Sequence, residues 1–449
     1  MSSLVRNLAL AATAAIIVPA SAGAQMLGVG ALPPVNLPLP TANIPTGNVP
    51  VAGPMLQNIL AQPSAQQAIS PTLDTVGGLS GIVAESGAPT LLELRRLRLQ
   101  ELIRTNRATV EADGNGLPVR RGIVAVIDPD QLGLQRVLSA GFRIAGDDRD
   151  PALGMRVVSL AVPSGMSARD GLKRLHGIAP ELQADFDHLF EPAGAGLLPI
   201  AGALAATQGG SSGPAIGMID GGVASHPSLA HASIEQNGFS GSPQPTGHGT
   251  AVASLLVGSQ GPFRGAATDA RLFVADVYGG NRAAGSATSI VRALGWLSGH
   301  RPQVINISLV GPPDKLVERA IQLVEARGIE VVAAVGNDGP AAPPQYPASY
   351  PGVVAVTAVD ASGRALPEAG KPTHLDFAAP GADMAAALPG IGYTRVRGTS
   401  FAAPLAAARL LAAGSPGALA TEARPGKGRV GRGIVCGACR IEPRIVGAK

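Results

Sequence analysis

Gly398-Thr399-Ser400-Phe401-Ala402-Ala403-Pro404 is the stretch from which the fold of this chain can be worked out. A glycine and two hydroxyl residues lead into an apolar, alanine-rich segment that continues to Ala413, which predicts a tight turn followed by a helix. We expect Pro404 to lie in the first helical turn, where the missing N–H of proline has no partner anyway. Ser400 then lies at the positive end of the helix dipole, which suits a nucleophile and an oxyanion. Because a serine alone is unreactive, the rest of the chain must supply a base, a residue that orients it and an oxyanion donor.

The region before this stretch alternates between strand and helix patterns. Near-continuous apolar runs predict buried strands, and amphipathic segments predict helices between them; the strands are expected at 215–219, 271–277, 303–309, 330–335 and 353–359, and the helices at 248–257 and 314–327. Such alternation is typical of a parallel sheet with helices on both faces. The predicted fold class is therefore α/β, a doubly wound and mostly parallel sheet, in a domain of residues 214–449 that ends in a short Cys-containing tail.

A smaller domain is predicted at residues 121–192. Its strand and helix patterns follow the order β-α-β-β-α-β, which is typical of a ferredoxin-like α+β sandwich. Nothing in it gathers into a site, and we expect its two histidines, His176 and His188, to be isolated and structural.

Residues 193–213 are rich in Gly, Ala and Ser and predict a flexible linker. Within it, Gly209-Gly210-Ser211-Ser212-Gly213 matches the G-x-S-x-G nucleophile elbow. That elbow requires a strand before it and a helix after it, and a linker offers neither, so we attribute the match to chance.

The N-terminal segments predict export. Arg6, the apolar run from Leu8 to Val18 and the small residues Ala22-Gly23-Ala24 resemble a cleavable signal peptide over residues 1–24, with an uncleaved anchor as the alternative. We therefore expect a secreted or periplasmic protein. Residues 25–90 are a low-complexity leader, predicted to be disordered, and residues 91–120 are a basic amphipathic helix and a connection.

Composition narrows the function classes. The chain has 449 residues, of which 46% are hydrophobic, 3% aromatic and 15% charged, and its net charge is +4. So weak a charge with so few aromatic residues argues against nucleic acid as a partner. Cys436 and Cys439 favour either a small-loop disulfide or inert thiols, because a zinc site would need more ligands than this region offers. We expect no cofactor and no metal.

Three residues are predicted to meet Ser400 at one edge of the sheet. Asp220 ends the first strand, His248 opens a helix between two glycines, and Asn337 follows a buried strand. In open parallel sheets, sites gather outside the carboxyl ends of the strands. If the four meet, His248 can accept the proton of Ser400 and Asp220 can orient the imidazole. Asn337 can then donate to the oxyanion.

The motifs resemble those of the subtilisin-like serine proteases. Met218 to Gly222, Gly247 to Ala253 and Gly398 to Pro404 resemble the family's Asp, His and Ser signatures, in the order that subtilisin has. Val335-Gly336-Asn337 resembles the oxyanion loop, and Asn306 to Leu309 resembles the edge segment that pairs with substrate. The resemblance implies that catalysis rests on Asp220, His248 and Ser400, with Asn337 in the oxyanion hole, and that the substrate contacts Ser308, Leu309, Val310 and Gly336. It also implies that residues 121–192 act as a propeptide that blocks the site until it is cleaved.

A few positions depart from the family pattern. Gly221 stands where Ser or Thr is usual, and Ala251 where a second histidine is common. Val310 stands where a glycine often lets the substrate backbone approach, which leaves the details of substrate pairing open.

The resemblance implies an exported serine endopeptidase whose partners are a polypeptide substrate and its own pro-domain. One alternative is a catalytically silent relative that binds peptides, which the intact Asp220, His248, Ser400 and Asn337 argue against. Another is a lipase or esterase, for which the elbow is lacking and the motif order differs. A membrane surface is the alternative partner for residues 91–107, against a helix packed on its neighbour.

Overall fold

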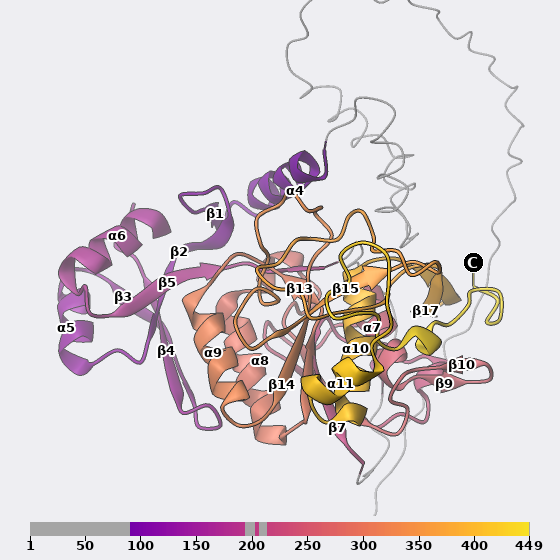
Figure 1. Cartoon of the computed structure of the whole chain (residues 1–449). Helices are drawn as coiled ribbons and strands as arrows, with labels where there is room; N and C mark the ends of the chain where they lie inside the picture. The colour runs from indigo at the N-terminus through magenta and orange to yellow at the C-terminus, as the bar shows by residue number, and fades with distance from the viewer. Residues whose placement is uncertain (1–89, 194–202, 206–212, 449) are drawn as a thin grey trace, which may run out of the picture. The chain divides into compact units, whose positions relative to one another are not determined.

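The structure is a computed structural model that describes residues 90–193, 203–205 and 213–448. The predicted signal peptide, the leader up to residue 89, most of the linker and the glycines and serines at 209–212 lie outside the described residues. An N-terminal α+β region, indigo to magenta in Figure 1, precedes a larger region that carries a seven-stranded sheet.

Helix α4 (Leu91–Thr105) comes first and begins at a capping box. The Thr90 hydroxyl accepts a hydrogen bond from the backbone N–H of Glu93, and the Glu93 carboxylate accepts one from the N–H of Thr90. Leu99 is buried, whereas Leu92 and Leu97 are exposed. The helix predicted from the spacing of leucines and arginines is confirmed.

The N-terminal sheet is antiparallel, with the order β5-β2-β4-β3 and the short β1 also paired to β2. Its elements are β1 (Val110–Ala112), β2 (Pro118–Ile127), α5 (Gln131–Ser139), β3 (Arg143–Asp150), β4 (Met155–Ala161), α6 (Ala168–Ile178) and β5 (Gln183–His188). The apolar sides of α5 and α6 pack on the sheet in one core. The β-α-β-β-α-β order is present as predicted. Strand β1 was not predicted, because Val-Glu-Ala is too short to show a period.

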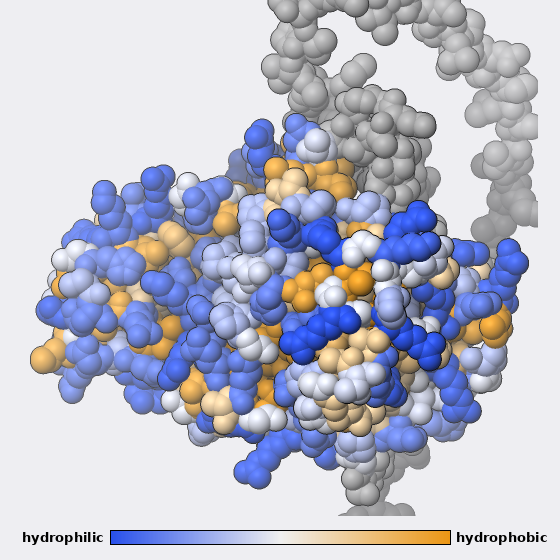
Figure 2. Space-filling view, in the orientation of Figure 1, coloured by the Kyte–Doolittle hydropathy of each residue, from blue (hydrophilic) through white to orange (hydrophobic). Residues whose placement is uncertain are grey.

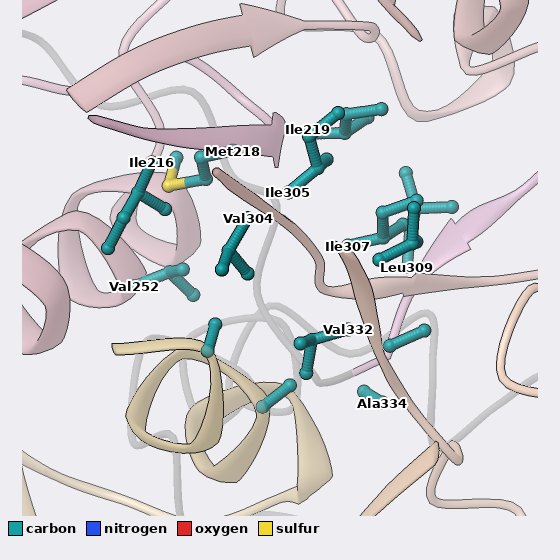
Figure 3. Packing of buried hydrophobic residues seen from close by; sticks show 14 of the residues in the cluster. Ile216, Met218, Ile219, Val252, Val304, Ile305, Ile307, Leu309, Val332 and Ala334 are labelled. Atoms are coloured by element: carbon teal, nitrogen blue, oxygen red, sulfur yellow. The ribbon is translucent and has the colours of Figure 1, made fainter. Parts of the chain in front are cut away.

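The larger sheet is parallel, with the order β16-β15-β14-β12-β7-β11-β8. Its strands are β7 (Ala215–Asp220), β8 (Ile234–Gly238), β11 (Arg271–Asp276), β12 (Val304–Ile307), β14 (Glu330–Ala334), β15 (Val354–Val359) and β16 (Phe377–Pro380). Strands β7, β12 and β14 are buried almost throughout, and Figure 3 shows Ile216, Val304 and Val332 among the apolar side chains on one face of these strands, with Ile219 and Ile305 on the other. This burial on both faces explains why the strands read as continuous apolar runs.

Helices cover both faces of this sheet. α7 (Gly247–Val257) packs with α10 (Thr399–Ala413), and α10 also packs against β12, β14 and β15. α8 (Ala287–His300) packs with α9 (Lys315–Glu325) and against β7 and β11. The doubly wound arrangement is the one predicted, although α8, β8 and β16 were not identified from the sequence.

Short elements complete the larger region. These are β6 (Glu191–Pro192), β9 (Ser259–Gln260), β10 (Phe263–Arg264), β13 (Leu309–Val310), β17 (Met384–Leu388), β18 (Gly392–Val396) and α11 (Pro416–Glu422), with 3-10 turns at Pro227–Leu229, Arg282–Ala284 and Gly437–Cys439. Near the end of the chain, Cys436 and Cys439 form a disulfide, which resolves the two alternatives that the sequence left open.

The contacts of α4 help to decide whether residues 91–107 bind a membrane surface or pack on the neighbouring part of the chain. Figure 2 shows hydrophilic and hydrophobic residues mixed on the face of the molecule in view. Two arginines of the helix, Arg95 and Arg98, make ion pairs with the carboxylates of Asp338 and Glu191. Within the described residues, no helix combines the length and the hydropathy that a membrane span requires. The packed helix is therefore the interpretation that these contacts favour.

Candidate active site

Asp220 and His248 form a buried hydrogen-bonded pair. Asp220 is the last residue of β7, and His248 is the second residue of α7, which Thr246 caps. His248 Nδ1 lies 2.9 Å from both carboxylate oxygens of Asp220. Asp220 Oδ1 also accepts a hydrogen bond of 2.7 Å from the backbone N–H of Gly221. The carboxylate therefore fixes the ring so that Nε2 faces away from Asp220.

Gly249 allows this close approach of helix and strand. A Cβ at Gly249 would lie 2.3 Å from the carbonyl oxygen of Gly221, which follows β7 directly. A side chain there would push α7 away from the end of β7. The glycine after His248 thus brings the imidazole within reach of Asp220.

Ser400 is the second residue of α10, and the helix follows a glycine with φ of 142°, a conformation that favours glycine. The ring of the next residue, Phe401, lies 5.3 Å from the His248 ring. Ser400 Oγ and His248 Nε2 are both buried, and neither has a hydrogen-bond partner among the described residues. The structure thus brings two reactive polar atoms to adjoining helix starts and leaves both unpaired.

Pro404 does not lie in the first helical turn, so this expectation was wrong. α10 begins at Thr399, which puts the proline in the second turn, opposite the carbonyl of Ser400. Because proline has no N–H, that carbonyl lacks its helical partner. The Ser308 hydroxyl donates to it instead, at 3.0 Å, and Asn306 donates in turn to Ser308 Oγ at 2.9 Å. Ser308 is therefore joined to the backbone of Ser400.

Asn337 is oriented by the turn before α10. Its Oδ1 accepts a hydrogen bond of 3.0 Å from the backbone N–H of Thr399, which directs Nδ2 the other way. Nδ2 donates to the carbonyl oxygen of Ala193. The amide beside Ser400 thus already holds a peptide carbonyl.

The predicted substrate-binding segment is occupied by the chain itself. β6 pairs antiparallel with β13, so that Pro192 lies opposite Leu309 and Glu191 opposite Val310. The N–H of Ala193 donates to the Ser308 carbonyl at 2.9 Å.

On the other side of this segment, the N–H of Phe190 donates to the Gly285 carbonyl at 2.7 Å. Val310 therefore does not prevent strand pairing. The linker boundary at 193 was drawn one residue early, since Ala193 continues the paired segment. The feature of the sequence that marks this paired segment is the apolar pair Leu189-Phe190, shortly before the small residues of the linker.

His188 is not isolated, contrary to expectation. Its Nδ1 lies 2.9 Å from Asp314 Oδ2, at the start of α9, and its Nε2 lies 3.7 Å from Asp113 Oδ2. Burial alone would lower the pKa of His188, but the two carboxylates outweigh it and raise the pKa to about 10. No local sequence pattern marks this cluster, because its members lie far apart in the chain.

The same cluster has donor atoms of the kind that bind cations. Donor atoms of Asp185, His188 and Asp314 lie within 4.8 Å of one another. Both nitrogens of His188, however, face carboxylates, and the two oxygens of Asp185 accept the backbone N–H groups of Phe186 and Lys315. The contacts are those of a charged imidazole between carboxylates, which needs no ion.

A second carboxylate beside Asp220 was not predicted. Asp276 ends β11 in register with Asp220, and its oxygens accept the backbone N–H groups of Gln244, Tyr278 and Gly279. Burial raises the pKa of Asp276, and the charge of Asp220 adds to that rise. With three N–H donors, this carboxylate holds the loops around Asp220.

A parallel α/β sheet with an Asp–His pair and a serine at its carboxyl edge is typical of a serine hydrolase. Comparison with known proteins identifies the family, because the sequence model of the Subtilase family matches residues 211–415 of this chain. Subtilisin Savinase from Lederbergia lenta is 34% identical over 199 residues, a match that covers 43% of this chain and 73% of that protein. An alkaline protease from Alkalihalobacillus alcalophilus is 34% identical over 43% of this chain, and the match spans 52% of that relative, about half its length.

Among solved structures, that of fervidolysin from Fervidobacterium pennivorans, a keratinolytic enzyme related to subtilisin, matches with a TM-score of 0.59. The match has 18% sequence identity and covers 72% of this chain and 61% of that one, so it supports the fold alone. The chain belongs to the subtilase family of serine proteases, and the predicted fold class is confirmed.

Proposed function

We propose that this protein is an exported serine endopeptidase in which Ser400 is the nucleophile. The observation that carries the proposal is the Asp220–His248 pair, which leaves His248 Nε2 without a partner among the described residues. Within the same residues Ser400 Oγ is also unpaired, and the ring of the next residue, Phe401, lies 5.3 Å from the His248 ring. In this mechanism, Ser400 Oγ attacks the peptide carbonyl carbon while His248 takes its proton. Asp220 stabilises the imidazolium, which then protonates the leaving amine, and water hydrolyses the acyl-enzyme by the same steps in reverse.

Asn337 is the proposed oxyanion donor, together with the backbone N–H of Ser400. The hydrogen bond from its Nδ2 to the Ala193 carbonyl supports this role, because that oxygen is where a substrate's carbonyl would be. A donor fixed in advance stabilises the charge that develops on this oxygen in the transition state.

The N-terminal region is the proposed intramolecular inhibitor and first substrate. Glu191 and Pro192 pair with β13 as an extended peptide, and the carbonyl of Ala193 is held at Asn337. The bond between Ala193 and the following Gly194 is therefore the one that Ser400 would cut. Export rests on the signal-like composition of residues 1–24.

The test compares wild-type protein with the Ser400→Ala variant. The variant should neither hydrolyse peptides nor react with a fluorophosphonate probe, because it lacks the attacking hydroxyl. Ser242→Ala, which removes an exposed hydroxyl, is the matched control and should label as wild type does. Labelling that persists in Ser400→Ala would refute the proposal, and wild-type protein that neither labels nor cleaves would favour a silent peptide-binding relative.

A further inference from the structure

The residue before the scissile bond is held from two sides. Ala193 donates its N–H to the Ser308 carbonyl, and its carbonyl oxygen accepts from Asn337. These two bonds place Ala193 beside the strip between Ser308, which joins β12 to β13, and the loop that contains Asn337. Ala193 is only 2% exposed and packs in the main apolar core. The side chains that fill this strip determine how large the side chain of residue 193 can be.

Gln345 fills one part of this strip. It is 3% exposed, and its Nε2 donates to Asp338 Oδ2 at 2.6 Å. This bond directs Oε1 toward Gly336, where a Cβ, if the residue had one, would lie only 2.2 Å from that oxygen. Oε1 is buried and has no hydrogen-bond partner among the described residues. The amide therefore fills the space next to Gly336.

Val310 fills the other part. Its Cγ1 lies 3.4 Å from the same point on Gly336, and its backbone pairs with Glu191. A neighbouring cavity lined by Val310, Gly311, Asp338 and Gln345, among others, has a free volume of about 20 Å³. That is room for about one water molecule, which needs about 10–15 Å³ by this measure. Arg95, Arg98 and Leu99 of α4 line the same cavity.

We infer that Gln345, together with Val310, closes the space for the side chain before the scissile bond, so that the enzyme cuts after small residues such as alanine, glycine or serine. This inference rests on the proposed function and names its substrate class. A large apolar or aromatic residue at this position would have to displace a buried amide that Asp338 holds. Gln345 is thus a specificity-determining residue.

The first test uses self-cleavage of the full chain. Ala193→Phe should slow cleavage after residue 193 by about a hundredfold, the order by which a pocket rejects a poorly fitting side chain. Adding Gln345→Gly to Ala193→Phe should restore the rate to within about tenfold of wild type, because it removes the amide. Adding Gln345→Met, which keeps the bulk without the hydrogen bond, should not restore it. Cleavage of Ala193→Phe at the wild-type rate, or equal rescue by both Gln345 changes, would overturn the inference.

A second test needs no hydrolysis. In the Ser400→Ala chain, amide hydrogen exchange at residues 190 and 193 reports the bonds to Gly285 and Ser308. Ala193→Phe should speed this exchange at least about tenfold, and adding Gln345→Gly should slow it again, whereas β7 should keep its protection in every variant. Unchanged exchange in Ala193→Phe would contradict the inference. A wild-type chain that does not cut itself would instead contradict the proposed function, and the exchange result would still decide the inference.

Discussion

The carbonyl of Ser400, the proposed nucleophile, is bonded to Ser308, directly before β13. Pro404 leaves this carbonyl without a helical donor, and Ser308 donates to it at 3.0 Å. The backbone of Ser308 in turn accepts the N–H of Ala193. One proline thus couples the position of Ser400 to the strand that holds the peptide.

The proposed role of Asn337 as oxyanion donor can be tested by substitution. Asn337→Leu keeps the volume but removes the donor to the Ala193 carbonyl, so the rate of self-cleavage should fall by about 10²–10³-fold. The appearance of the processed band over time measures it. Asn237→Leu, at an exposed position, is the control and should process normally. A loss of less than about threefold in Asn337→Leu would exclude Asn337 as the oxyanion donor.

His188 gives a pH prediction. Its pKa is raised to about 10, so the stability it contributes is fully present below about pH 6.5 and is lost as the pH rises toward 10. Between pH 7 and pH 9, its loss should lower the free energy of unfolding by up to about 1.4 kcal/mol per pH unit. Urea unfolding of the Ser400→Ala chain at pH 7, 8 and 9 measures this slope.

In this range the carboxylates that face His188 stay ionised, since the pKa of Asp314 is raised only to about 6 and that of Asp113 is lowered. His188→Gln should therefore flatten the slope, whereas His176→Gln, which has no carboxylate partner among the described residues, should keep it. A slope that is the same in both variants would refute this role of His188.

Single residues can be predicted from the sequence where a motif carries them. Asp220, His248 and Ser400 each stand at the end of an element, and such ends can be read from local patterns. The His188–Asp314 contact joins residues 126 positions apart, and no local pattern marks it. Pro404 was misplaced because the start of a helix cannot be set to within a residue or two from sequence.

At the scale of elements, we propose that α4 acts as a latch on the segment that occupies the cleft. Arg98 contacts Glu191 in β6 and Asp338 next to Asn337, and Arg95 also contacts Asp338. Both carboxylates are buried, with side chains less than a tenth exposed. A buried carboxylate that loses its partner is costly, so the arginines should hold the strand even after it is cut.

Arg98→Gln should therefore release the cleaved N-terminal region faster, by about tenfold, because it leaves Glu191 and Asp338 less well paired. Surface plasmon resonance with the purified cleaved complex measures the dissociation rate. Arg96→Gln changes an exposed arginine on the same helix for which the described residues show no ion pair, and it should leave the rate unchanged. If both variants dissociate at the same rate, α4 is not a latch.

The elements themselves were largely predictable. The apolar strands and the helices with Asp130, Ser167 and Asp314 at their starts follow from period and capping. Helix α8 was missed because most of its residues are buried, which weakens the amphipathic pattern. The pairing of β6 with β13 was not predicted, since two residues carry no period.

At the scale of the whole molecule, the chain places one of its own extended segments along the predicted substrate-binding residues. Hydrogen bonds from Phe190 to Gly285 and from Ala193 to Ser308 set residues 190–193 against the larger sheet region. The fold class and the site edge could be predicted, because alternating strands and helices restrict where a site can form. The pairing of residues 190–193 with the larger sheet region could not be predicted. It depends on contacts between residues far apart in the chain, and the composition of the two regions does not show that they pack together.

N-terminal sequencing of the purified wild-type chain beside its Ser400→Ala variant shows whether Ser400 cuts the segment that the cleft holds. We predict that wild type gains a new terminus at Gly194, directly after the carbonyl held by Asn337, and that Ser400→Ala stays uncut at this bond. The same terminus in both proteins, or a wild-type cut far from Ala193, would contradict this mechanism.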